Sequence, residues 1–358
     1  SLVGARADQL VFTKNATEAV NLLALAVASA SLRRPSARGG GPADAGDPSR
    51  RLALGEGDEV LVSRAEHHAN LVPWQELCAR TGARLRWLEL TEDGRVDASA
   101  EAVARVVTER TRVIALTHAS NVTGALTPLD AVLAAARAVG ATVLLDTCQS
   151  GAHLPLDFAA LSAAGVDAIV LSSHKMLGPT GVGALVATEE LLEAMPPVLT
   201  GGSMIELVTM ESSTYMSGPA RFEAGSQPLA QAAGWVAAAD YLARLGLDRL
   251  HAGEQVLTRR TLDGLASVPG VRVLGPTDTV DRLGVVAFGV EGVHPHDVGQ
   301  LLDAAGVAVR TGHHCAQPIH AAFGVHASSR VSFGPTTTPE EIDRFLEAVA
   351  HVRSYFQR

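Results

Sequence analysis

Lysine and cysteine are scarce in this sequence, and both residue types can take part in catalysis. The 29 basic residues include only two lysines, Lys14 and Lys175, and the chain has only three cysteines. An arginine cannot replace a lysine whose amine must lose its proton or form an imine, so we expect such a role for Lys175. Cys315 follows two histidines in RTGHHCAQP, residues 310–318. Its thiol could be a nucleophile, a metal ligand or a packed core group, and the other motifs must decide among the three.

Polar residues follow several short apolar runs that have the composition of β-strands. In an open α/β sheet, ligands bind at the carboxyl ends of the strands, so these residues are the first candidates for a site. They are Thr17 after QLVFT, His67 and His68 after EVLVS, His118, Ser120 and Asn121 after RVIALT, Asp146 and Gln149 after ATVLL, and Ser172, Ser173, His174 and Lys175 after DAIVL.

Each candidate has a chemical and a structural interpretation. Thr17 begins a helical run, where main-chain N–H groups suit a phosphate but also form an ordinary cap. His67 could stack on a planar cofactor, or it could form a surface pair with His68. The amide of Asn121 could bond a substituent of a ring. Asp146 ends a nearly all-apolar run, and a buried carboxylate needs a partner, such as a protonated ring nitrogen or the N–H groups that it caps.

Taken together, these residues are the parts of a site for pyridoxal 5′-phosphate (PLP). Lys175 would hold the cofactor as an imine, and Asp146 would keep the pyridine nitrogen protonated. His67 would stack on the ring. The expected phosphate ligands are Thr17, Ser172 and His174.

The elements that must position these residues alternate along the chain. Short β-branched runs alternate with longer Ala- and Leu-rich helical runs, which predicts an α/β fold with a largely parallel sheet. From residue 229 the pattern changes to long helices and two more strands, which predicts a smaller α+β domain. We expect a cofactor-binding domain at 1–242 and a domain carrying Cys315 at 243–358. The expected strands are 9–13, 59–63, 84–90, 112–118, 141–146 and 167–173, and the expected helices are 17–29, 70–80, 128–140, 229–245, 247–267, 296–305 and one from residue 339.

Composition narrows the class of protein. The net charge of −9 argues against a broad nucleic-acid-binding surface. No apolar run reaches the roughly 20 residues that span a bilayer, and SLVGARADQLVF lacks the layout of a signal peptide. Three cysteines form no disulfide framework, which favours the reducing cytoplasm. Residues 33–51 are rich in Gly, Pro, Asp, Ser and Arg and are expected to form a mobile surface loop.

The assembled motifs closely resemble those of the cysteine desulfurases, the PLP enzymes of the class V aminotransferase family that move sulfur from L-cysteine. The resemblance is to the second, SufS-like type, which includes relatives of selenocysteine lyase. It implies the type I fold of PLP-dependent transferases, with a mixed, mostly parallel sheet in the large domain and a smaller α+β C-terminal domain. The motifs run through almost the whole chain in the family's order: TEAVNLLA, EHHANLVPWQELCARTGA, SNVTG, LLDTCQS, SSHKMLGPTGVGAL, RFEAGS and RTGHHCAQP.

The resemblance also implies a role for each matching residue. Lys175 would bind PLP, His67 would stack on it, and Cys315 would accept sulfur as a persulfide while L-alanine is released. The persulfide would pass to an acceptor protein of the SufE or SufU kind, for iron–sulfur cluster assembly or other sulfur delivery. The other implied ligands are Asp146 at the pyridine nitrogen, Gln149 and Asn121 on the oxygen side of the ring, Thr17, Ser172 and His174 at the phosphate, Ser226 at the partner subunit's phosphate in a homodimer, and Arg330, Arg310 and Asn121 around the substrate.

Several questions stay open at this point. His313, His314 or Arg310 could favour the Cys315 thiolate, and the sequence does not say which. The chain lacks the family's N-terminal helix and a small Ala/Ser motif, so either the full protein carries them or the chain is a truncated, non-catalytic partner. Selenocysteine lyase and other class V C–S lyases share most of these motifs. A zinc site that adds His320 to the histidines and Cys315 is disfavoured, because adjacent ligands cannot all face one ion without unusual backbone.

Overall fold

The computed structural model describes residues 2–32 and 47–356. Most of the expected mobile loop, residues 33–46, lies outside these described residues. The end of that segment differs from the expectation, because Pro48–Leu52 forms a short 3-10 helix, η3. Asp47 caps η3 by accepting from the N–H of Ser49, and both Ser49 and Leu52 are buried. Burial of these two side chains explains why this part of the segment is folded against the core.

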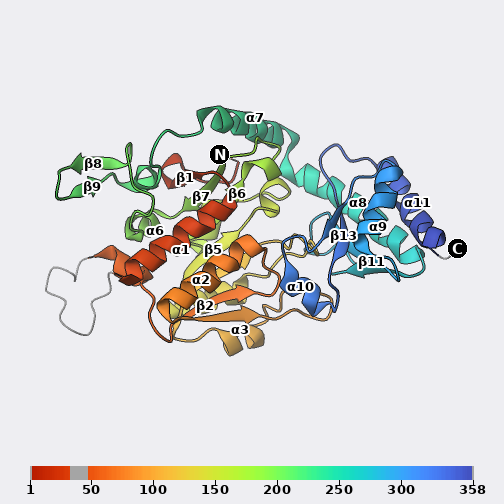
Figure 1. The fold of residues 1–358 in the computed structure, drawn as a ribbon, viewed down its shortest axis with the longest axis horizontal. Coiled ribbons are helices and arrows are strands. Elements are labelled where there is room, and N and C mark those ends of the chain that lie inside the picture. The colour runs from red at the N-terminus through yellow and green to blue at the C-terminus, as the bar shows by residue number, and fades with distance from the viewer. Residues whose placement is uncertain (1, 33–46, 357–358) are drawn as a thin grey trace.

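A mixed seven-stranded sheet forms the larger part of the molecule (Figure 1). Its strand order is β1-β7-β6-β5-β4-β2-β3, and only β7 runs against the other strands. This arrangement confirms the expected, largely parallel sheet. The strands are β1 (Leu10–Thr13), β2 (Glu59–Ser63), β3 (Arg84–Leu88), β4 (Thr111–Thr117), β5 (Thr142–Asp146), β6 (Ala168–Ser172) and β7 (Gly183–Ala187).

This sheet is covered on both faces, which explains why its central strands are nearly continuous apolar runs. All five residues of β2 are buried. Val60 and Val62 belong to the core on one face, and Leu61 belongs to the core on the other. Because successive side chains of a strand point to opposite faces, one apolar run serves both layers.

Helices form the two layers around the sheet (Figure 1). The layer against Val60 and Val62 contains α1 (Ala16–Leu32), α2 (Val72–Thr81) and α6 (Glu189–Ala194). The layer against Leu61 contains α3 (Ala100–Val106), α4 (Asp130–Val139), α5 (Phe158–Ala164) and α7 (Leu229–Leu245). The expected helices at 17–29, 70–80, 128–140 and 229–245 are confirmed within a few residues. Among the described helices, none combines the length and the apolar character that crossing a bilayer requires.

A second, four-stranded antiparallel sheet lies toward the C-terminus, with the order β10-β11-β13-β12. Three helices, α8, α9 and α11, pack on it around a core of their own (Figure 1). The expected boundary at 242/243 falls inside α7, and the division into two domains stays a prediction. The elements are α8 (Leu247–Ser267), β10 (Val271–Leu274), β11 (Val285–Val290), α9 (Pro295–Ala304), β12 (Arg310–Gly312), α10 (Gln317–Ala322), β13 (Ser328–Ser332) and α11 (Pro339–Phe356).

The antiparallel strand β7 was not among the expected strands, because glycines at 178, 181 and 183 precede and interrupt its apolar run. At Gly183 an added Cβ would lie 2.6 Å from the Cα of Asn15 and 2.6 Å from the carbonyl oxygen of Leu171. Only glycine therefore lets β7 pass this close to its neighbours. The short strands β12 and β13 and the hairpin of β8 (Ile205–Val208) and β9 (Ser213–Tyr215) were also not expected.

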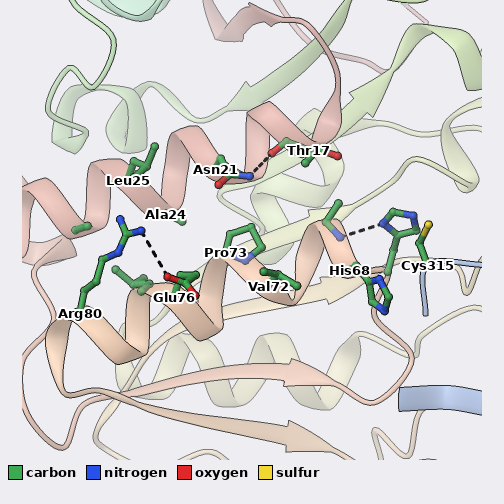
Figure 2. A pocket seen from close by; sticks show the side chains of 14 residues that line it. Thr17, Asn21, Ala24, Leu25, His68, Val72, Pro73, Glu76, Arg80 and Cys315 are labelled. Carbon is green, nitrogen blue, oxygen red and sulfur yellow. Dashed lines mark hydrogen bonds and ion pairs between the residues drawn. The ribbon is translucent and has the colours of Figure 1, made fainter. Parts of the chain in front are cut away.

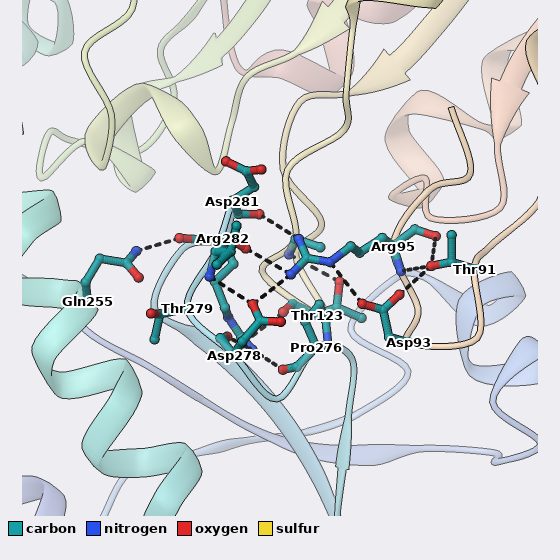
Figure 3. A network of polar contacts seen from close by, with 12 residues as sticks. Thr91, Asp93, Arg95, Thr123, Gln255, Pro276, Asp278, Thr279, Asp281 and Arg282 are labelled. Carbon is teal, nitrogen blue, oxygen red and sulfur yellow. Dashed lines mark hydrogen bonds and ion pairs between the residues drawn. The ribbon is translucent and has the colours of Figure 1, made fainter. Parts of the chain in front are cut away.

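A fully buried arginine joins the two sheets (Figure 3). Arg282 is 1% exposed, and burial lowers its pKa to about 10, so the guanidinium stays cationic near neutral pH. All its hydrogen-bond acceptors are main-chain carbonyls, one of them in the SNVTG loop that follows β4. The acceptors are the carbonyl oxygens of Thr123 (2.9 Å), Val285 (2.7 Å), Leu283 (3.4 Å), Asp278 (3.4 Å) and Pro276.

We expect Arg282→Met to destabilise the protein, because several buried carbonyls would lose their only charged donor. The expected loss in the free energy of unfolding is about 3 kcal/mol, measured by urea denaturation. Arg259→Met is the matched control: Arg259 is exposed and bonds Thr279 Oγ1 at 3.1 Å, so its loss should cost less than about 0.5 kcal/mol. Equal stability of both variants would contradict the structural role of Arg282.

Candidate active site

The ends of β5 and β6 and the start of α1 meet at one edge of the large sheet. Asp146 ends β5 and is 6% exposed; its Oδ1 accepts from the main-chain N–H of Cys148 at 2.9 Å. No Lys, Arg or His in the described part of the chain forms an ion pair with this carboxylate. Ser172 ends β6, and its Oγ accepts from the N–H of Ala16, in the first turn of α1, at 2.9 Å. A buried carboxylate and a helix N-terminus therefore lie at neighbouring strand ends, as the sequence predicted.

The loop after β2 presents a neutral imidazole. His67 precedes a 3-10 helix, η4 (His68–Asn70), and its Nδ1 accepts from the N–H of Ala69 at 3.0 Å. Burial lowers the pKa of His67 to about 4, the charge of Lys175 lowers it further, and Asp146 opposes the shift. The ring is therefore neutral near neutral pH, with its proton on Nε2. His67, Lys175 and Asp146 lie close enough to influence one another electrostatically.

Glu66 is a buried carboxyl group that the sequence analysis missed. Its Oε1 lies 2.5 Å from Ser63 Oγ and accepts from the N–H of Thr117 at 2.9 Å, while Oε2 accepts from Asn70 Nδ2 at 2.7 Å. Burial raises the pKa of Glu66 to about 8, so the group is mostly protonated near neutral pH. Glu66 thus ties the ends of β2 and β4 to η4. The signal available in the sequence was an acidic residue shortly after the apolar run of β2, EVLVS.

Cys315 lies between β12 and α10, in a loop that residues of the large sheet hold in place. The carbonyl of Cys315 accepts from the N–H of His68 at 2.7 Å, and the carbonyl of His314 accepts from Asn121 Nδ2 at 2.7 Å. Arg310 Nη2 donates to Cys315 Sγ at 3.5 Å. His314 is buried, and burial lowers its pKa to about 3, so its ring is not a cation near neutral pH. Arg310 is therefore the candidate activating group that contacts the thiol as a cation.

Cys315 differs from the other two cysteines of the chain, all of which are free. Cys78 and Cys148 are buried at 7% exposure each, whereas Cys315 is half-buried. Burial raises the pKa of Cys78 to about 11, and it raises the pKa of Cys148 as well. Because the reactive form of cysteine is the thiolate, Cys315 is the thiol best placed to react.

Arg330 and Asn121 present polar groups that the described residues leave unpaired. Arg330 Nη1 donates to the carbonyl of Asn121 at 2.9 Å, but Arg330 Nε and Asn121 Oδ1 are buried without a partner in the described residues. Arg310 and Arg330 occupy paired positions on β12 and β13. Burial and the charge of Arg310 lower the pKa of Arg330 to about 10, so the guanidinium is still cationic near neutral pH. The unpaired donor of Arg330 suits a carboxylate, and the unpaired acceptor of Asn121 suits an N–H or O–H group, so the pair suits a small ligand that carries both.

A cavity of about 410 Å³ extends from Cys315 between α1 and α2 (Figure 2). Thr17, His68 and Cys315 lie at one end of it. His67 also lines the cavity. At the other end Arg80 Nη2 and Glu76 Oε2 form an ion pair at 3.6 Å, and apolar side chains of both helices lie between (Figure 2). The thiol is therefore open to this groove.

Other predicted residues lie outside this cavity. Lys175 is half-buried at the end of a 3-10 helix, η6 (Ser173–Lys175), and lines a second cavity, of about 530 Å³, with His153 and Glu254. The charge of Lys175 thus acts on His67, but Lys175 does not line the cavity that contains Cys315. Of the remaining predicted ligands, Gln149 is half-buried, while His174 and Ser226 are exposed.

The histidines near Cys315 make hydrogen bonds with a serine. His314 Nε2 and His320 Nε2 each lie 2.9 Å from Ser328 Oγ. Within the described residues there is no group of three or more His, Cys, Asp or Glu side chains that could hold a metal ion.

The chain resembles known proteins both in sequence and in fold. The family described as "Aminotransferase class-V" matches residues 48–345. The chain is 46% identical over 359 residues to the "Probable cysteine desulfurase 2" of Mycobacterium leprae, and the match covers 100% of this chain and 80% of that protein.

Solved structures agree with the sequence relatives. The cysteine desulfurase CsdA from Escherichia coli has a TM-score of 0.85 at 34% identity, and the match covers 97% of this chain and 79% of that chain. The cysteine desulfurase from Thermococcus onnurineus has a TM-score of 0.87 at 31% identity, and the match covers 99% of this chain and 81% of that chain. This likeness confirms the expected type I fold. The chain belongs to the class V aminotransferase family and, within it, to the cysteine desulfurases.

Proposed function

We propose that this protein is a cysteine desulfurase that converts L-cysteine to L-alanine and takes the sulfur on Cys315 as a persulfide. The observation that carries the proposal is the position of the Cys315 thiol. It is half-buried at the end of a cavity that His67 also lines, and Arg310 Nη2 donates to it at 3.5 Å. His68 and Asn121, which follow β2 and β4, hydrogen-bond the loop of Cys315, and this supports a role for the thiol next to the proposed cofactor site.

The residues at these strand ends fit PLP. Asp146 is a buried carboxylate without an ion pair in the described residues, which suits a protonated pyridine nitrogen. Ser172 Oγ and the first turn of the 17-residue α1 suit a phosphate, and the neutral ring of His67 suits the face of a planar ring. When bound, PLP supplies an electron sink for the charge that develops on the substrate's α-carbon. The further proposed ligands are Thr17 and His174 at the phosphate and Gln149 and Asn121 on the oxygen side of the ring.

Lys175 has two proposed roles. It would hold the cofactor covalently, and its free amine would then take the proton from the substrate's α-carbon. Lys14, the other lysine, is exposed, and its Nζ lies 3.5 Å from Glu18 Oε1 in an ion pair. Lys175, by contrast, follows directly on the end of β6.

Cys315 would act as the nucleophile toward the substrate's sulfur. A sulfur–sulfur bond forms as the carbon–sulfur bond of the substrate breaks, and the electron pair of the broken bond stays with the fragment that a proton converts to alanine. Arg310 favours the thiolate because a cation beside a thiol stabilises its ionised form. Arg330, whose Nε is unpaired in the described structure, would bind the substrate's carboxylate, and the unpaired Oδ1 of Asn121 would accept from a donor group of the substrate, which together fix its orientation.

The proposal extends to partners and setting. A homodimer in which Ser226 reaches the partner subunit's phosphate agrees with the exposed apolar hairpin β8–β9 nearby in sequence, where Leu207, Val208 and Met210 are 60%, 53% and 97% exposed. The groove beside Cys315 gives an acceptor protein of the SufE or SufU kind access to the persulfide. The three free cysteines fit a reducing compartment, so we place the protein in the cytoplasm, serving iron–sulfur cluster assembly.

We expect Lys175→Ala to abolish turnover of L-cysteine and to remove the visible absorbance of purified protein, because the covalent attachment is lost. Lys14→Ala is the control that removes the other lysine and should keep both properties. A colourless wild-type protein that stays colourless after incubation with PLP would rule out the cofactor assignment.

We expect Cys315→Ala to keep the visible absorbance of bound cofactor but to lower alanine formation from L-cysteine by about 100-fold or more, because the sulfur has no acceptor. Cys78→Ala, at a buried cysteine between α1 and α2, should keep most of the activity. Running the assay with L-selenocysteine in parallel tests the alternative of a selenocysteine lyase. Full turnover of L-cysteine by Cys315→Ala would refute the nucleophilic role.

Glu66 should make the stability of the protein depend on pH. Its pKa is about 8 in the folded state, against an ordinary value of 4.5, so its contribution to the unfolding free energy is fully present below pH 4.5 and is lost as pH rises through about 8. The quantity to measure is the unfolding free energy of wild type minus that of Glu66→Gln. We expect this difference to fall by about 1–4 kcal/mol between about pH 5 and about pH 9. A difference that does not change with pH in urea denaturation would contradict the protonated state of Glu66.

A further inference from the structure

The loop that carries Cys315 has a backbone that needs support. His314 and Cys315 are consecutive residues with φ of 52° and 57°, in the left-handed region that favours glycine. Asn121 and His68 hold the two carbonyls of this pair from the large sheet. A third support comes from the small sheet itself, through the side chain of His314.

Three buried side chains form this third support. Ser328 Oγ, on β13, lies 2.9 Å from His314 Nε2 and 2.9 Å from His320 Nε2. Ser328, His314 and His320 are 0%, 2% and 1% exposed. His320 Nδ1 lies 2.8 Å from the carbonyl oxygen of Ala316, the residue after Cys315. The chain of contacts therefore leaves the loop at His314 and returns to it at Ala316.

The direction of each hydrogen bond follows from the first acceptor. A carbonyl only accepts, so His320 Nδ1 carries a proton and donates to Ala316. Burial lowers the pKa of His320, so the ring is neutral and its Nε2 accepts from the Ser328 hydroxyl. Ser328 Oγ then accepts from the N–H of His314 Nε2. The Ser328 hydroxyl, between the two rings, therefore donates to His320 Nε2 and accepts from His314 Nε2.

We propose that Ser328 is a positioning residue that, together with His320, holds the Cys315 loop in its left-handed conformation and so keeps the thiol beside Arg310. The register of the small sheet supports this role, because Ser328 pairs with Gly312 and Arg330 pairs with Arg310 across β12 and β13. Removing the hydroxyl leaves two buried ring nitrogens without their partner, and the loop then loses its support from the small sheet.

The consequence concerns the reactivity of the thiol. Arg310 contacts Sγ from β12, and Arg330 on β13 is the second cation that acts electrostatically on Cys315. The neighbouring rings of His67 and His314 are neutral near neutral pH, since burial lowers their pKa to about 4 and about 3. If the loop relaxes, Sγ moves relative to both guanidinium groups, and the thiol loses the cationic contact that Arg310 makes with it.

The direct test is the rate at which iodoacetamide alkylates Cys315 as a function of pH, in purified protein without L-cysteine. The other two cysteines are buried, and Cys315→Ala gives the background. We expect Ser328→Ala to be alkylated about tenfold more slowly than wild type near neutral pH, with its pH profile moved to higher pH. Ser328→Thr keeps the hydroxyl and should restore the wild-type profile.

Two further variants separate positioning from general damage. Ser329→Ala removes the neighbouring hydroxyl of β13, whose Oγ lies 3.4 Å from the carbonyl of Pro295, and should leave the profile unchanged. His320→Phe keeps a buried ring but removes both hydrogen bonds of His320. We expect it to be alkylated as slowly as Ser328→Ala, and it can still be measured if Ser328→Ala folds poorly. A wild-type alkylation profile in both Ser328→Ala and His320→Phe would overturn the proposal.

The role in sulfur transfer rests on the proposed function, but the alkylation test does not. With L-cysteine as substrate, kcat of Ser328→Ala should fall about tenfold or more, while KM stays within about twofold and the visible absorbance of the holoenzyme is unchanged. If Ser328→Ala is alkylated slowly but wild type does not turn over L-cysteine, the proposed function is refuted and the positioning role of Ser328 stands. Normal alkylation with active wild type would refute the positioning role alone.

Discussion

The hydrogen bond from Asn121 Nδ2 to the carbonyl of His314, at 2.7 Å, joins the loop after β4 to the loop that carries Cys315. The rest of the site depends on this contact. It fixes one of two successive left-handed residues, and the carbonyl of the next residue is fixed by His68, which follows β2. Because both donors follow strand ends of the large sheet, they hold the loop of Cys315 close to the edge where the proposed cofactor ligands lie. A site divided between two sheets can work only if such contacts set its geometry.

The loops after β2 and β4 are kept in place by buried polar side chains that make several hydrogen bonds each. Arg282 offers its guanidinium to main-chain carbonyls on both sides of the junction, including that of Thr123, two residues after Asn121 (Figure 3). Glu66 joins the loop of His67 and His68 to the sheet as an acceptor: the N–H of Thr117 and Asn70 Nδ2 donate to it, and Ser63 Oγ lies 2.5 Å away. A buried charge or carboxyl group is costly to the fold unless its hydrogen bonds are made, so these two groups specify one arrangement of their loops.

Much of the fold could be predicted because periodicity and composition determine it locally. EVLVS is a strand and 229–245 and 247–267 are helices with the expected bounds. The strand β7 was missed because three glycines precede and interrupt its apolar run, and because its direction depends on packing against β1 and β6 rather than on its own residues. Short strands such as β12 carry too few residues for a pattern.

The sequence predicted which residues of the candidate site to consider, but not the hydrogen bonds between them. Strand ends identified Asp146, His67 and Ser172, since residues at the carboxyl ends of parallel strands converge. Which group contacts the thiol could not be predicted from RTGHHCAQP, because Arg310, His313 and His314 all lie within five residues of Cys315 and the sequence does not show which of them faces it. Backbone conformation decides it: the strand directs Arg310 to Sγ, while the ring of His314 is directed to Ser328.

The central claim is that Cys315 receives the sulfur of L-cysteine. The most direct measurement is mass spectrometry of the holoenzyme after incubation with L-cysteine in the absence of an acceptor, with the thiols trapped by alkylation before digestion. The account predicts one additional sulfur atom on the peptide that contains Cys315 and none on the peptides of Cys78 and Cys148. Alanine release without added sulfur on Cys315, or added sulfur on one of the buried cysteines instead, would contradict it.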